Sequence, residues 1–137
     1  MIEGLSHITF IVKDLNRTSD FLTSVFEAKE VFVSGEKKYS YSKEMYFLVN
    51  GLWIAIMEGE SLSEKTYNHV ALKVSETDLE KYEERVRSIG LEILNDRSRI
   101  DGEGRSLYFY DYDNHLFELH TGTLNQRLES YDAPSIF

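Results

Sequence analysis

Residues 6–15 read SHITFIVKDL, and residues 68–79 read NHVALKVSETDL. Both segments run from a polar residue to a histidine, then through an alternating stretch to an acidic residue and a leucine. The two histidines, His7 and His69, lie 62 residues apart, which is close to half of the chain. A repeat on this scale indicates two copies of one supersecondary unit.

Each histidine segment is followed by apolar residues at helical spacing, which predicts a helix in each half. Asp14 or Asn16 can cap the first of these helices. After each helix the alternating pattern returns three times, which predicts three strands per half. These strands are expected at about 29–34, 39–49 and 52–58 in the first half and at about 91–97, 105–111 and 115–121 in the second.

The chain is therefore predicted to have an α+β fold of two βαβββ repeats, at about residues 4–60 and 66–122. We expect the two units to pair into one curved mixed sheet around a cleft. A closing helix and a tail would occupy residues 123–137. We expect residues 1–137 to form a single domain, because a domain of ~150 residues is usual.

The composition narrows the classes of function. The chain has 15 basic and 24 acidic residues and a net charge of −9, which argues against non-specific binding to nucleic acid or anionic lipid. It has no cysteine, which excludes a disulfide scaffold, a cysteine nucleophile and a thiolate metal site. No stretch approaches the ~20 apolar residues of a membrane span. The start of the chain does not read as a signal peptide, so we expect a cytoplasmic protein.

Three residues form a candidate metal site. His7 and His69 occupy equivalent positions of the two repeats, on the strand face opposite the apolar core positions. Glu118 lies in an otherwise apolar final strand, where an ionised carboxylate is costly unless it is paired or bound to a metal. Nitrogen and oxygen ligands suit Mn, Fe, Zn or Ni. The alternative is that each histidine is a hydrogen-bonded structural residue. His120 shares the parity of Glu118 and could add a further group.

Glu44 is a candidate general base. It shares a strand face with Tyr46, so that both side chains would line the cleft if either does. A carboxylate near a metal but not bound to it can take a proton from a nucleophile. The alternative is a solvated strand end.

A basic loop and the strand after it form a candidate anion site. Arg97, Arg99 and Arg105 lie close together in a glycine-containing segment, and guanidinium groups grip phosphate-like oxygens. Ser106 and Tyr108 share a strand face and could add hydroxyl groups. Arg127 in the closing helix could add charge. The alternative for the arginines is ordinary surface charge.

These segments, together with residues 51–56 (GLWIAI) and 105–122 (RSLYFYDYDNHLFELHTG), resemble the fosfomycin-resistance enzymes. Those enzymes belong to the vicinal oxygen chelate superfamily, alongside glyoxalase I and the extradiol dioxygenases. The resemblance covers about residues 1–130. It implies a homodimer in which the βαβββ units swap between chains, so that the partner subunit supplies the position of His7.

The resemblance also implies which residues form the site. A divalent metal, usually Mn²⁺, would be held at His7, His69 and Glu118. The small-molecule substrate would be fosfomycin, a phosphonate epoxide. Arg99 or Arg97 would replace a cation that the family carries in its loop. The positions that match the family's substrate site are Thr9, Tyr46, Trp53, Tyr67, Ser106, Tyr108 and Arg127.

Members of this family add either a thiol or water to the epoxide. The water-adding members resemble this chain in carrying a glutamate two residues before the substrate-site tyrosine, here Glu44 before Tyr46. We therefore expect a Mn²⁺-dependent hydrolase that forms a vicinal diol phosphonate and confers antibiotic resistance. The alternatives are a glutathione or bacillithiol transferase on the same metal site, a metal-free drug-binding protein, and a dioxygenase or glyoxalase.

Overall fold

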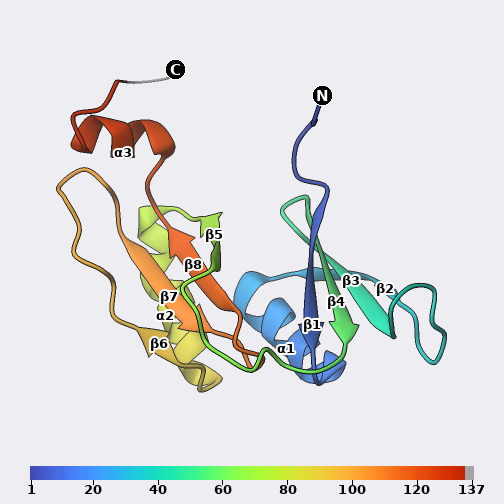
Figure 1. Ribbon diagram of the computed structural model, residues 1–137. Coiled ribbons are helices and arrows are strands. Elements are labelled where there is room, and N and C mark those ends of the chain that lie inside the picture. The colour runs from blue at the N-terminus through green and yellow to red at the C-terminus, as the bar shows by residue number, and fades with distance from the viewer. Residues whose placement is uncertain (135–137) are drawn as a thin grey trace. The chain divides into compact units, whose positions relative to one another are not determined.

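The computed structural model describes residues 1–134, and the last three residues of the predicted tail lie outside this range. The chain divides into two compact units (Figure 1). The first unit comprises Met1–Glu64 with the turn Tyr112–His115, and the second comprises Lys65–Asp111 with the chain from Leu116 onward. Each unit contains one βαβββ repeat, so the predicted α+β fold of two repeats is confirmed.

The first unit is a mixed four-stranded sheet in the order β1-β4-β3-β2. Strands β1 and β4 run parallel, and the other pairs are antiparallel. Asp14 is the cap of α1, because its side chain accepts a hydrogen bond from the backbone N–H of Arg17. The elements are β1 (His7–Val12), α1 (Leu15–Phe26), β2 (Lys29–Val33), β3 (Glu44–Val49) and β4 (Leu52–Glu58).

The strand predicted at 39–49 is too long, because β3 begins only at Glu44. Its neighbour β2 ends at Val33, so residues 39–43 have no strand to pair with. The pairing of β2 with β3 ends at Ser34 and Glu44. The Ser34 hydroxyl accepts a hydrogen bond from the Glu44 N–H, and the Ser34 N–H donates to the Glu44 carbonyl.

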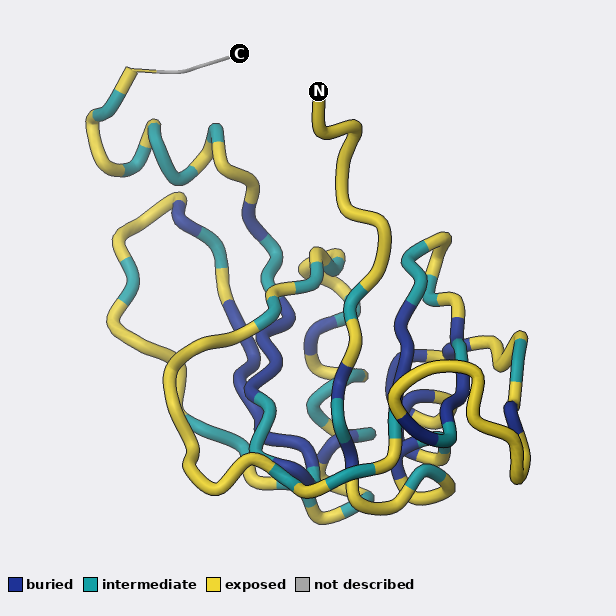
Figure 2. Tube along the Cα trace, turned by 45° about the vertical axis from the view of Figure 1, so that its right-hand side comes forward, coloured by how far each residue is buried: buried dark blue, intermediate teal, exposed yellow. Residues whose placement is uncertain are grey.

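Strand alternation gives the first sheet a core face and an open face. Phe10, Val12, Phe47, Ile54 and Ile56 are buried, and α1 packs against this sheet with its own buried residues (Figure 2). The intervening positions, which include those of His7 and Thr9, point to the opposite face. The alternation predicted for β1 is therefore confirmed.

The second unit repeats the same topology in the order β5-β8-β7-β6, with β5 parallel to β8. Gly90 follows α2 with φ of 76°, a left-handed conformation that favours glycine at a helix end. Thr123 and Gln126 form a capping box at the start of the last helix. The elements are β5 (His69–Lys73), a 3₁₀ turn (Glu76–Asp78), α2 (Leu79–Ser88), β6 (Ile93–Leu94), β7 (Ser106–Tyr110), β8 (Leu116–His120) and α3 (Leu124–Ser130).

One expectation for the second half needs correction. The strand predicted at 91–97 is reduced to Ile93–Leu94, because the chain then leaves the sheet as a loop whose arginines bond to acidic side chains. Each repeat forms its own mixed four-stranded sheet. The cleft expected between the two repeats stays a prediction. The expectation that residues 1–137 form a single domain also stays a prediction.

The turn Tyr112–His115 joins β7 to β8 but packs within the first unit. The Asp113 carboxylate accepts hydrogen bonds from the Lys13 N–H at 2.9 Å and the Ser61 hydroxyl at 2.5 Å. The His115 ring meets Phe10 edge-on. This turn therefore belongs to the first compact unit, although it follows β7 in the chain, and the predicted repeat bounds of about 4–60 and 66–122 stay a prediction. No helix among residues 1–134 is long and apolar enough to cross a bilayer.

Candidate metal and anion-binding site

His69 and Glu118 are brought together by the parallel pairing of β5 with β8. The His69 Nε2 atom lies 3.0 Å from Glu118 Oε1. The Nδ1 atom of His69 is 2.7 Å from the Tyr67 carbonyl, which can only accept, so Nδ1 carries the proton. The Nε2 atom then faces a carboxylate oxygen, and either a proton or a metal ion can lie between the two atoms. The pair therefore fits two ligands of a divalent metal.

His7 lies in the first unit, on β1. Its ring stacks on Trp53 with centroids 4.1 Å apart, and its Nδ1 is 3.0 Å from the Ser6 hydroxyl. Among residues 1–134, no group of three histidine, aspartate or glutamate side chains is placed to hold a metal ion together. The structure thus brings together two of the three predicted ligands. The role of His7 stays a prediction about the assembled protein.

A series of hydrogen bonds that starts at Arg127 ends at the Glu118 carboxylate and holds it in place. Arg127 can only donate, so the His120 Nε2, 3.4 Å away, accepts. The His120 Nδ1–H then donates to Ser106 Oγ at 2.7 Å, and the Ser106 hydroxyl donates to Glu118 Oε2 at 2.5 Å. Burial lowers the pKa of His120, which favours the neutral ring that this series of hydrogen bonds requires. His120 is therefore a supporting residue of the site.

Glu118 is held as a carboxylate in this setting. It is 4% exposed, and burial alone would raise its pKa. The hydrogen bond from Ser106 and the neighbouring charges outweigh burial, so the pKa lies below its usual range. An ionised carboxylate is the form that binds a metal.

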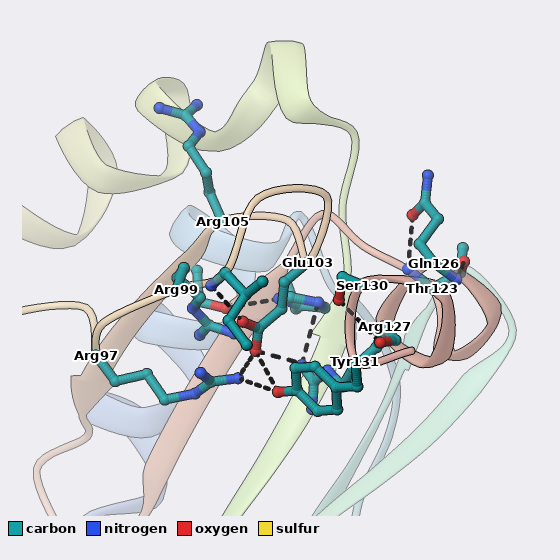
Figure 3. Close-up of polar contacts among 12 residues, drawn as sticks. Arg97, Arg99, Glu103, Arg105, Thr123, Gln126, Arg127, Ser130 and Tyr131 are labelled. Carbon is teal, nitrogen blue, oxygen red and sulfur yellow. Dashed lines mark hydrogen bonds and ion pairs between the residues drawn. The ribbon is translucent and has the colours of Figure 1, made fainter. Parts of the chain in front are cut away.

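Arg99 is the loop arginine that reaches the site. Its Nη2 lies 3.1 Å from the Tyr108 hydroxyl and 3.5 Å from Glu118 Oε2, and its guanidinium also pairs with Asp96. Arg97 instead bonds to Glu103 (Figure 3) and to a loop carbonyl. Arg105 pairs with Glu80 on α2. Of the two arginines that the sequence leaves open for the loop cation, the structure places Arg99 beside the metal-ligand pair.

Tyr108 and Tyr67 complete this part of the site. The Tyr108 hydroxyl accepts hydrogen bonds from Tyr67 at 3.2 Å and from Arg99. Its own proton is directed at the Glu118 carboxylate, whose pKa it helps to lower. Burial and the Tyr67 hydrogen bond raise the pKa of Tyr108, so it stays protonated at neutral pH. A neutral phenol beside a guanidinium suits an anionic oxygen.

Glu44 is the most unusual residue of the first unit. It is 1% exposed, and neither carboxylate oxygen has a hydrogen-bond partner among the described residues. Tyr46 lies on the same strand face, and the Glu44 carboxylate, together with burial, raises the pKa of Tyr46. No hydrogen bond of ordinary geometry reaches either Glu44 oxygen in the described part of the chain. A buried carboxylate without donors is energetically costly and often functional.

Aromatic rings surround the open face near Glu44. Tyr46 meets Trp53 edge-on with centroids 5.2 Å apart, and Phe32 lies on the other side of Tyr46. The Trp53 indole N–H is also buried without a partner, and Thr9 is exposed on the neighbouring strand. The structure therefore groups the predicted residues of the first half on one face.

The sequence analysis missed two acidic residues of the second unit. Glu103 is fully buried, and Asp96 bonds to Arg99 and to the Ser106 N–H. A single acidic residue between glycines 102 and 104, in an otherwise arginine-rich loop, is the signal that could have pointed to Glu103. Its burial depends on Tyr131, which is distant in sequence.

Comparisons with known proteins agree with this geometry. Residues 4–119 match the family model described as the Glyoxalase/Bleomycin resistance protein/Dioxygenase superfamily. The chain is 60% identical to the fosfomycin resistance protein FosX of Listeria innocua, over 96% of this chain and 98% of that protein. It is 36% identical to the metallothiol transferase FosB of Bacillus licheniformis, over 95% and 82%.

A solved structure is similar over nearly the whole chain. It is a mutant of FosX from Listeria monocytogenes complexed with Mn(II) and 1S,2S-dihydroxypropylphosphonic acid, with a TM-score of 0.88 and 56% identity. The match covers 96% of this chain and 99% of that chain.

Proposed function

The chain belongs to the Glyoxalase/Bleomycin resistance protein/Dioxygenase superfamily, and we propose that it is a Mn²⁺-dependent hydrolase that adds water to the epoxide of fosfomycin. The product is a vicinal diol phosphonate, and its formation confers resistance to the antibiotic. The diol phosphonate in the similar Listeria monocytogenes structure supports this reaction. The observation on this chain that carries the proposal is the buried, unpartnered Glu44 carboxylate.

Glu44 is the general base of the proposed reaction. Its two free oxygens let it accept a proton from a water molecule as that water attacks an oxirane carbon. The C–O bond of the ring breaks, and the released oxygen takes up a proton to give the second hydroxyl of the diol. Water is consumed, and no thiol is required.

The metal would be held by His69 and Glu118, with His7 as third ligand. The fixed Nδ1–H of His69 and the Ser106 hydrogen bond to Glu118 orient these two donors. When bound, Mn²⁺ supplies a Lewis acid for the negative charge that develops on the oxirane oxygen. We propose that His7 is supplied by the partner subunit of a homodimer, as the family resemblance implies.

Residues of both units would hold the substrate. In the second unit Arg99 and Arg127 supply positive charge for the phosphonate, and Tyr108 would turn its proton from Glu118 to one of the phosphonate oxygens. Ser106 acts mainly through Glu118 and His120, because its hydroxyl is already engaged by both. The remaining substrate positions are Thr9, Tyr46, Trp53 and Tyr67. We propose that the protein acts in the cytoplasm.

The test is phosphorus-31 NMR of fosfomycin incubated with metal-stripped protein, with and without Mn²⁺ and with and without thiol. We expect the diol phosphonate whenever Mn²⁺ is present, at a rate that added glutathione or bacillithiol leaves unchanged. A thiol adduct as the main product would assign the chain to the transferases, where the FosB relative belongs. Absence of any product in all four samples would refute the proposed substrate.

A further inference from the structure

We propose that Glu103 is a positioning residue for the anion site. It holds the loop of residues 97–104 against the C-terminal helix through its hydrogen bond with Tyr131. In this arrangement Arg99 and Arg127 are held ready for the phosphonate before it arrives. The inference rests on the proposed function for the identity of the anion. It extends that function to two residues that do not touch the substrate.

Glu103 is the point where the loop and the helix meet (Figure 3). Its Oε1 atom accepts hydrogen bonds from Arg97, from the Tyr131 hydroxyl at 2.7 Å and from Arg99 Nη1 at 3.4 Å. The Arg127 Nε lies 4.0 Å from the same atom. The other oxygen, Oε2, accepts from the Ile100 N–H at 2.9 Å, so this carboxylate is fully satisfied.

Charge explains why a carboxylate is needed here. Three guanidinium groups lie around one point, and without a counter-ion they would repel one another and move into solvent. The Arg97 hydrogen bond, with those of Ile100 and Tyr131, lowers the pKa of Glu103 to about 2, so it is ionised at neutral pH. Glu103 and Asp96 carry two negative charges against the three guanidinium groups. Glu118 is a third acidic neighbour of Arg99. Once a divalent metal neutralises Glu118, one positive charge remains for the phosphonate.

Two glycines allow the loop to lie this close to the chain before α3. A Cβ built on Gly122 would be 2.5 Å from the Glu103 carbonyl oxygen, and one on Gly104 would be 2.8 Å from the Gly122 nitrogen. Only glycine at both positions permits this backbone contact. The contact is a second feature, independent of the charges, that places Glu103 over the start of the helix.

The geometry also separates Glu103 from the metal ligands. Arg99 lies between the two acidic groups, with Glu103 on one side and Glu118 on the other. A change at Glu103 should therefore alter the binding of the anion and leave metal binding intact. This difference distinguishes a positioning role from general support of the fold.

The experiment compares Glu103→Gln with Glu129→Gln in the Mn²⁺-loaded protein. Both variants remove one negative charge near α3, but Glu129 is exposed on the helix surface. We expect Glu103→Gln to raise the KM for fosfomycin about 10-fold and to change kcat by less than about 2-fold. The Mn²⁺ affinity, followed by EPR titration, should stay unchanged. Glu129→Gln should behave as wild type in all three measurements.

Tyr131→Phe gives a second variant in case Glu103→Gln does not fold. It removes only the hydroxyl that bonds to Glu103, and Tyr39→Phe at an exposed tyrosine is its control. We expect Tyr131→Phe to raise KM about 3-fold, less than Glu103→Gln does, because the carboxylate and its other hydrogen bonds remain. Wild-type KM in both Glu103→Gln and Tyr131→Phe would overturn the inference.

Equilibrium binding of inorganic phosphate by calorimetry separates this inference from the proposed function. If wild type does not turn over fosfomycin, the proposed function fails, and weaker phosphate binding in Glu103→Gln still supports the positioning role. If wild type hydrates fosfomycin and the variants bind phosphate as tightly as wild type, only the positioning role is wrong. Parallel loss of Mn²⁺ affinity in Glu103→Gln would also contradict it, because a general disturbance would then explain the change.

Discussion

The two units present their functional side chains in opposite ways. On the open face of the first unit, the carboxylate of Glu44 and the indole N–H of Trp53 are buried without hydrogen-bond partners. In the second unit, Arg99 bonds to three carboxylates and a phenol, and Glu118 is reached through Ser106 and His120. The polar groups of the first unit's site lack hydrogen-bond partners, whereas those of the second unit's site have several each.

This difference matches the tasks that we propose for the two units. A base that must accept a proton gains from having no donor bound to it in the resting state. Groups that hold a metal or a phosphonate gain from a rigid frame, since binding then orders fewer side chains. The same topology therefore supplies reactivity in one copy and pre-organisation in the other.

The largest effect on the rate of hydration is expected from substitution of the proposed metal ligands, one in each unit. His7→Ala and Glu118→Ala should each abolish hydration, because loss of a ligand removes several kcal/mol of charge stabilisation, on the order of 10³-fold in rate. If His7 comes from the partner subunit, a mixed dimer of the two variants keeps one intact site of two. Dimers purified through two different tags should then show about half of wild-type activity.

The parent homodimers serve as controls for that experiment, because neither contains an intact site. A mixed dimer as inactive as its parents would mean that each site takes all of its ligands from one chain.

A smaller effect compares the glycines that follow the last strand of each unit. A Cβ on Gly122 would meet the Glu103 carbonyl oxygen at 2.5 Å, whereas one on Gly59 would meet side-chain atoms, the Ile11 methyl group at 2.5 Å and the Tyr41 ring at 3.9 Å. A side chain can relieve such a clash by changing its rotamer, but a backbone carbonyl group cannot. Gly122→Ala should therefore destabilise the protein by about 1–3 kcal/mol, as overpacking does, and Gly59→Ala by less. Urea unfolding of the two variants measures the difference, and equal losses would show that the close contact is not a constraint.

The smallest effect concerns acid stability. The folded pKa of Glu103, about 2, lies below its ordinary value of 4.5, so its ionised form stabilises the folded protein at pH above 4.5. That contribution falls as the pH drops from 4.5 towards 2. The stability difference between wild type and Glu103→Gln should be constant from pH 7 to about 5 and shrink below it. Glu129→Gln is the control, and a difference that grows on acidification would have the wrong sign.

The sequence was sufficient for the parts of the fold that depend on local pattern. The repeated histidine strands predicted both units, and strand parity placed Tyr46 with Glu44. The position of Glu118 in an apolar strand was the signal for a partner such as His69. Asp14 was correctly expected to cap α1. These features follow from alternation and capping within a few residues.

Features that depend on distant contacts were not predictable. Residues 39–43 carry a strand-like composition but have no neighbouring strand, so they form bends. Asp113 lies in a turn whose partners, Lys13 and Ser61, are far away in the chain. The choice of Arg99 over Arg97 likewise depends on where Glu103 and Tyr131 meet. Periodicity carries no information about any of these contacts.

The most direct test of the account is Glu44→Gln, assayed for fosfomycin hydration and for Mn²⁺ and phosphate binding on the same sample. Gln has the size of Glu but cannot accept the proton, so we expect hydration to fall by about 10²–10⁴-fold. Both binding constants should stay within about 2-fold of wild type, because among residues 1–134 no hydrogen bond joins the Glu44 carboxylate to another side chain. Hydration at the wild-type rate would contradict the division of tasks between the two units.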